Sequence, residues 1–75
     1  MVLYILRLHL FEQLAAVERH IVQGELNISA QRSRVAALEQ SGADAAFSRG
    51  LLANFEAALS MHNEHRGRIL RELAE

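Results

Sequence analysis

The chain contains no proline, and only one strong helix-breaking signal interrupts it, the Ser-Gly-Ala-Asp sequence at residues 41–44. Gly42 suits the left-handed residue that commonly follows a helix, and Asp44 is of the type that caps the start of the next one. The segments on both sides are rich in Ala, Leu, Glu, Gln and Arg, which favour helix. The sequence therefore predicts an all-α fold with one helical hairpin over residues 1–75, made of a helix at 3–41, a turn at 42–44 and a helix at 45–74.

Apolar residues recur at seven-residue spacing through both segments, as in an antiparallel coiled coil. Folding the chain at Gly42 places Glu39 opposite Arg49 and Arg32 opposite Glu56, so that both pairs have opposite charges. In the seam, the same register pairs Leu38 with Ser48, Gln31 with Phe55, Gly24 with His62 and Val17 with Ile69. Eight apolar residues are predicted to hold the seam: Leu14, Val17, Ile21, Ile28, Val35, Phe55, Leu59 and Ile69.

The length of 75 residues limits what one hairpin can bury. Small domains hide only about 60% of their unfolded surface, and they usually need a disulfide, a metal or a second subunit. The chain has no cysteine, so neither a disulfide nor a thiolate metal site is available. We expect a homodimer that forms a four-helix bundle, or a hairpin completed by a different protein. The interface is predicted at apolar residues that lie outside the seam: Tyr4, Leu8, Phe11, Val22, Leu51 and Leu70.

The amino-terminal run is the most apolar part, since nine of residues 1–11 are apolar. By the register above, its first ten residues overhang the second helix without a partner in the same chain. Burial against a second subunit, docking into a heterologous protein and attachment to a membrane surface remain open. A signal peptide is not expected because the run lacks a basic start, and Arg7 makes it too short to span a membrane.

Histidines suggest a second candidate site. His62 and His65 are three residues apart and share a helix face, and the register places His20 beside His65. Three imidazoles with Glu18 or Glu64 nearby suit zinc or a similar divalent ion. The alternatives are a proton-sensing group or a polar layer that fixes the register, in which Gly24 makes room for the ring of His62. We therefore expect no metal or other cofactor, and keep His20, His62 and His65 as metal candidates.

Arg66, Arg68 and Arg71 are the only basic concentration, and they define a third candidate, a weak nucleic-acid binder. Glutamates interleave with these arginines, and the net charge of the chain is −1. A solvated, salt-bridged face is the simpler interpretation, so no nucleic acid is expected. Catalysis is not expected either, because there is no thiol, no phosphate-binding glycine loop and no recognisable triad.

Several short motifs lie between residues 20 and 70: His20-Ile21-Val22-Gln23-Gly24-Glu25, Gln31-Arg32, Val35, Leu38-Glu39, Gly42-x-Asp44, Leu51-Leu52-x-x-Phe55-Glu56, Leu59 and His62-x-x-His65-Arg66-x-Arg68-Ile69-Leu70. Together they resemble the short, uncharacterised helical-hairpin proteins of alpha-proteobacteria. The resemblance covers about residues 20–70 and implies a cytoplasmic bacterial protein, but no activity. The apolar residues 1–11 lie outside it.

Overall fold

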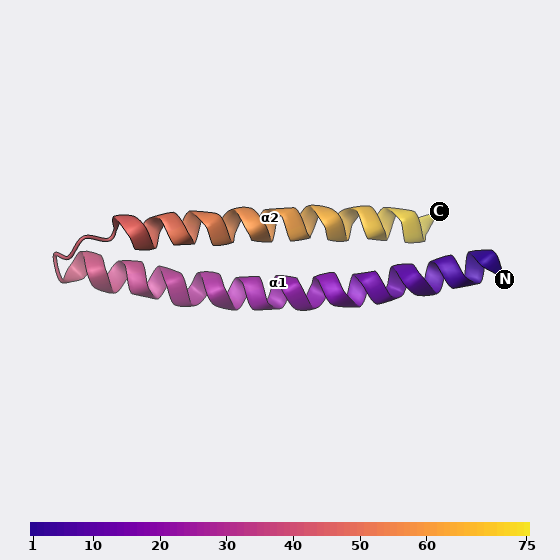
Figure 1. Ribbon diagram of the computed structural model, residues 1–75, viewed down its shortest axis with the longest axis horizontal. Coiled ribbons are helices and arrows are strands. Elements are labelled where there is room, and N and C mark those ends of the chain that lie inside the picture. The colour runs from indigo at the N-terminus through magenta and orange to yellow at the C-terminus, as the bar shows by residue number, and fades with distance from the viewer.

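A computed structural model describes all 75 residues, which form two helices, α1 (Val2–Gln40) and α2 (Ala46–Ala74). The helices run antiparallel and side by side, joined by one short connection (Figure 1). The predicted all-α class and the packing of two helices are confirmed, and each predicted helix end lies within one residue of the observed one. Neither helix contains a stretch long and apolar enough to span a membrane.

The connection reverses the chain through local chemistry. Gly42 has a φ of +75°, a left-handed conformation that glycine adopts without steric cost. The backbone N–H of Ala43 donates to the carbonyl of Leu38 at 3.0 Å, which satisfies one of the last carbonyls of α1. Asp44 lies one residue before the N-cap position, Ala45, and its carboxylate accepts from the backbone N–H of Ala46 at 2.9 Å, which satisfies a free donor at the start of α2.

The core is one thin seam between the helices. The molecule is a rod of 61 × 15 × 14 Å, and its radius of gyration is 17.3 Å. A compact domain of this length would have a radius of gyration of about 11 Å. Only seven of the 75 residues are buried, so the chain has no interior beyond the seam. All eight predicted seam residues are at least half-buried, and Val17, Ile28, Val35 and Ile69 are fully buried.

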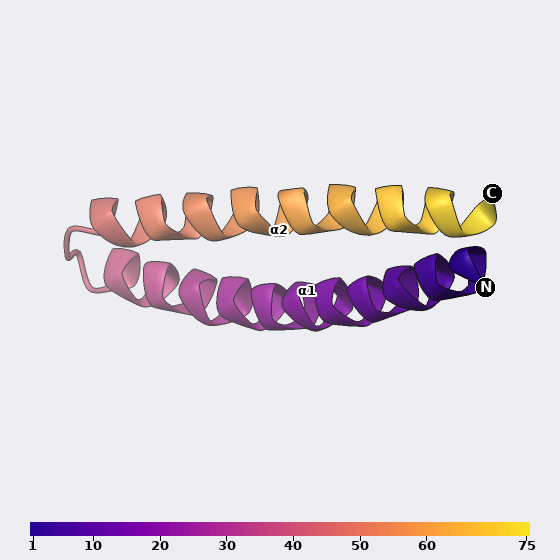
Figure 2. The ribbon, with the colours of Figure 1, turned by 45° about the vertical axis from the view of Figure 1, so that its right-hand side comes forward.

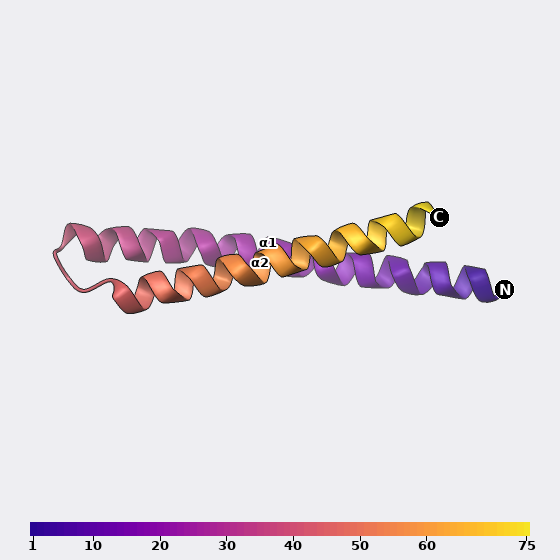
Figure 3. The same ribbon diagram turned by 90° about the horizontal axis from the view of Figure 1, so that it is seen from above.

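The two helices differ in curvature, since α2 is nearly straight (Figure 2). α1 curves gently along α2 (Figure 2), as long helices do when they wrap around a core. Viewed from above, the helix axes cross at a shallow angle (Figure 3), the arrangement typical of coiled coils and helical bundles.

Both predicted interhelical ion pairs form and confirm the register. Arg32 Nη2 lies 3.8 Å from Glu56 Oε2, and Arg49 Nη1 lies 4.0 Å from Glu39 Oε1. All four side chains are about half exposed or more, so each pair contributes only about 0–1 kcal/mol to stability. The pairs therefore report the alignment of the helices more than they stabilise it.

Two seam contacts differ from the prediction. The side-chain amide of Gln31, expected opposite Phe55, donates to the carbonyl of Ser48 at 3.0 Å in a buried hydrogen bond. Leu59, and not His62, lies over Gly24, where an added Cβ would be 3.4 Å from Leu59 Cδ1. The predicted register therefore holds to within about one helical turn, but it does not identify which side chain of that turn makes the contact.

The start of α1 projects beyond the end of α2 (Figure 1), as the register predicts. The expectation that the first ten residues lack any partner in the chain is wrong for Arg7. Its Nη1 donates to the carbonyl of Leu73 at 3.0 Å, since the last carbonyls of a helix have no intrahelical donor and the arginine side chain is long enough to reach back. The guanidinium also lies 5.9 Å from the centre of the Phe11 ring.

Candidate functional site

The seam divides the surface of the hairpin into two flanks that carry different residues. Three ion pairs cross between the helices on one side, which we call the charged flank: Arg49–Glu39, Arg32–Glu56 and Arg66–Glu18. In a seven-residue repeat, the residues on either side of the seam positions point to opposite sides of the helix pair. We call the opposite side, which contains His20 and Ala58, the uncharged flank.

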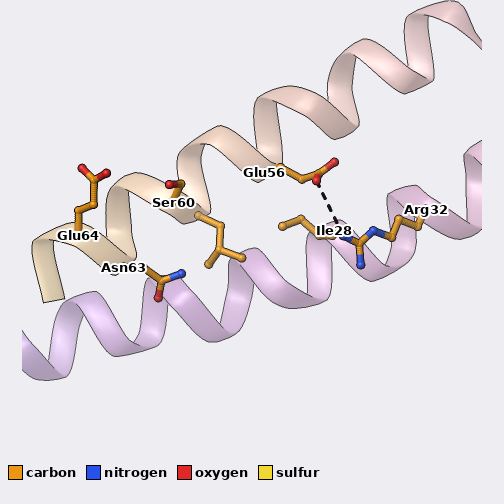
Figure 4. Close-up of a pocket in the computed structure, with 7 residues that line it drawn as sticks. Ile28, Arg32, Glu56, Ser60, Asn63 and Glu64 are labelled. Carbon is orange, nitrogen blue, oxygen red and sulfur yellow. Dashed lines mark ion pairs between the residues drawn. The ribbon is translucent and has the colours of Figure 1, made fainter. Parts of the chain in front are cut away.

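The charged flank carries an open groove of about 480 Å³ (Figure 4). Arg32 and Glu56 face each other across it, Asn63 points towards α1, and Glu64 points away. The charged groups of the ion pair are thus already paired across the seam. The groove is lined by Ile28, Arg32, Glu56, Leu59, Ser60, Asn63 and Glu64.

The uncharged flank carries a smaller groove of about 200 Å³. The rings of His20 and His62 meet at its edge, with their centres 5.1 Å apart and their planes tilted by 46°. The prediction placed His20 beside His65. His62 takes that position because Leu59 occupies the space over Gly24 that was expected to hold the ring of His62.

The three candidate metal-binding histidines do not form a cluster within the chain. His20 and His62 come together, but no group of three or more His, Asp or Glu side chains is placed to hold a metal ion. A pair of imidazoles supplies at most two of the four ligands that zinc takes in a structural site. Within one chain, the arrangement corresponds to the predicted polar layer more closely than to a metal centre.

The three arginines considered as a candidate nucleic-acid site do not converge. Arg66 Nε donates to Glu18 Oε2 at 3.3 Å across the seam. Arg71 lies along its own helix, with Nη1 3.4 Å from the position of a Cβ on Gly67. Arg68 is exposed two residues after Arg66, on another side of α2. The arginines therefore present no common surface to a phosphate backbone.

The predicted interface residues are unequally exposed. Tyr4, Leu8, Phe11 and Val22 are largely exposed, whereas Leu51 is half-buried and Leu70 is only just exposed.

The sequence interpretation missed two residues on α2 that are more exposed than Leu51 and Leu70. Phe47 is 80% exposed and Met61 is 68% exposed. Their fourteen-residue separation, which puts both in the same position of the repeat, is the signal that could have identified them.

The candidate functional site is therefore a surface of uncovered apolar side chains, not a closed pocket. Comparison with protein-family models, with curated proteins and with solved structures finds no match for the chain.

Proposed function

We propose that the chain is a small, self-associating helical interaction or regulatory module without catalytic activity, and that it forms a homodimer built as a four-helix bundle. The observation that carries the proposal is the exposed area of the hairpin, 5630 Å². A compact protein of 8.4 kDa exposes about 4,600 Å². The excess of about 1,000 Å² is similar to the 800 Å² that one partner buries in a standard protein interface.

The kind of surface supports the same proposal. Large apolar side chains are uncovered at both ends of the rod, including Tyr4, Phe11 and Phe47. Soluble monomers rarely leave so much apolar surface without a partner. Pairing two hairpins buries a second stripe on each helix, which is how four-helix bundles complete their core.

The molecular mass in solution tests the proposal. Light scattering should give twice the chain mass of 8.4 kDa, and the melting temperature should rise with chain concentration because association stabilises the folded state. A cooperative melting transition at the mass of one chain, unchanged by dilution, would contradict it.

A heterologous protein partner at residues 1–11 is a second candidate. The side chains from Val2 to Leu6 are all more than half exposed around the whole circumference of α1, which one flat dimer face would not cover completely. A chain that lacks residues 1–10 separates the two roles. If it no longer dimerises, the segment is an assembly element, whereas an unchanged dimer leaves the segment available for another protein.

The remaining candidates have less support. The His20–His62 contact is the one observation that favours a metal- or pH-responsive module, and a zinc titration followed by thermal melting tests it. Nucleic-acid binding through Arg66, Arg68 and Arg71 is disfavoured by the Arg66–Glu18 bond, and absence of binding at about 50 mM salt would end it. A cytoplasmic location, and kinship with the bacterial hairpin proteins, rest on the resemblance of residues 20–70.

A further inference from the structure

The two flanks differ most in formal charge. On α1, the uncharged flank consists of two rows of residues spaced seven apart. One row is Gln13, His20, Asn27 and Arg34, and the other is Ala16, Gln23, Ala30 and Ala37. On α2, it consists of the rows that follow Phe47 and Leu51, as far as Arg68 and Glu72. Apart from histidines, these rows contain three charged residues, and all three lie towards the ends of the face. Arg34 lies near the turn and donates to the side-chain oxygen of Gln31 at 3.5 Å, and Arg68 and Glu72 lie towards the open end.

We propose that the uncharged flank is the face through which two copies of the chain associate. This inference rests on the proposed self-association and names the surface that performs it. Of the six interface residues predicted from the sequence, it keeps Leu51, and Phe47, Ala58 and Met61 become the central contact residues. The other five belong to the rows of the opposite side: Tyr4, Leu8, Phe11, Val22 and Leu70.

Electrostatics favours this flank over the charged one. A two-fold dimer places one surface against its own copy, so each charge in the middle of the face meets like charges or has to be paired again. Covering the charged flank would remove three ion pairs from water, and the desolvation of charges often exceeds what their attraction returns. The uncharged flank has no interhelical ion pair, and its charged residues Arg34, Arg68 and Glu72 lie away from its middle. Charged residues are typically depleted at the centre of interfaces.

The uncharged flank is also complementary to itself in shape. Met61 projects from it, 68% exposed, and the groove of about 200 Å³ opens beside Ala58 and His62 on the same side. A projection and a hollow on one surface are what an interface between identical copies requires. Methionine is flexible and fills irregular gaps well, and aromatic residues such as Phe47 are enriched at interfaces.

The area of the flank agrees with the size of a stable dimer. A face of a rod 61 Å long and 15 Å wide covers about 900 Å². A standard interface takes about 800 Å² from each partner. An interface of standard size therefore has to run along nearly the whole length of the rod.

Neighbouring alanines on α2 provide a matched test. Ala58 lines the groove of the uncharged flank, whereas Ala57 points away from α1, and both are exposed. Sedimentation of the full-length chain should show that Ala58→Glu weakens the dimer by at least about tenfold, since it puts an unpaired carboxylate into the interface. Ala57→Glu makes the same substitution in the same helix and should leave the dimer intact.

A second matched pair of alanines on α1 controls for the possibility that a variant loses the dimer only because it misfolds. Ala37 belongs to the uncharged flank and Ala36 to the other side, and both are exposed. Ala37→Glu should weaken the dimer and Ala36→Glu should not, with circular dichroism confirming the helical content of each variant.

The outcomes separate this inference from the function on which it rests. If the unmodified chain sediments as a single chain at every concentration, the self-association itself is refuted. If it is a dimer, but Ala57→Glu and Ala36→Glu weaken it as much as or more than Ala58→Glu and Ala37→Glu, self-association stands and the assignment of the face is overturned.

Discussion

The turn end and the open end of the hairpin are built differently. Near the turn, the buried residues Ile28, Gln31, Val35 and Ser48 are close together, and an interhelical hydrogen bond and two ion pairs join the helices. Towards the open end, Val17 and Ile69 are still buried and Arg66 donates to Glu18. Beyond them, the side chains from Val2 to Leu6 are exposed, and one exposed hydrogen bond from Arg7 ties α1 to the end of α2. Local stability should therefore fall from the turn towards the open end, and the open end has most to gain from a partner.

The largest difference between the ends is expected for core truncation. Ile28→Ala removes a buried side chain in the turn half and should cost about 2–5 kcal/mol in the free energy of unfolding. Leu10→Ala removes a half-buried side chain in the open half and should cost less. Denaturant unfolding at one fixed chain concentration measures both. If both variants lose the same free energy of unfolding, the two ends do not differ in local stability, and the side chains of the open end are packed as well as those near the turn.

Two glycines near the turn should respond with opposite signs. Gly42→Ala forces a side chain into a left-handed conformation at φ +75° and should destabilise the fold by about 1–2 kcal/mol. Gly50→Ala lies inside α2, where an added Cβ meets nothing within 4 Å, and should stabilise the fold by about 0.5–1 kcal/mol. Thermal melting of both variants compares them directly. A stabilising effect of Gly42→Ala would show that the turn does not need its left-handed residue.

The cap of α2 gives a smaller and more local prediction. Asp44→Ala removes the acceptor for the backbone N–H of Ala46 and should cost about 1 kcal/mol in the free energy of unfolding. Asp44→Asn keeps a side-chain acceptor and should retain most of that stability. If the two variants lose equal stability, the carboxylate acts through its charge and not through the cap.

The smallest change is expected for Arg7→Ala at the open end. The hydrogen bond to Leu73 is exposed, so its loss should change the global free energy of unfolding by less than about 0.5 kcal/mol. Amide hydrogen exchange should nevertheless become faster in the last turn of α2 and stay unchanged near Ser48. Arg19→Ala, a change at an exposed arginine elsewhere on α1, is the control. If amide hydrogen exchange in the last turn of α2 is the same in both variants, the hydrogen bond from Arg7 does not hold the end of α2 against α1.

The features that were predictable from the sequence have local causes or strong charge signals. Gly42 and Asp44 define the turn because their backbone and capping preferences act within a few residues. Arg32 and Glu56 indicate the register because unlike charges at matching steps leave few other alignments. The length and type of both helices follow from composition and the absence of proline.

The details that could not be predicted depend on packing between the helices. Whether Leu59 or His62 covers Gly24 is decided by the joint fit of all the seam side chains. That fit in turn decides that His20 meets His62 and not His65. The hydrogen bond from Arg7 to Leu73 could not be predicted because it depends on the conformation of one long, flexible side chain.

The position of the chain termini has a practical consequence. Both lie at the open end, and the turn lies at the far end of a rod 61 Å long (Figure 1). A fluorophore or spin label attached to either terminus therefore leaves from the same end of the molecule. In a pair of copies, two such labels would be close together if the rods run in the same direction and roughly a rod's length apart if they run in opposite directions, so one distance measurement reads the orientation of the pair.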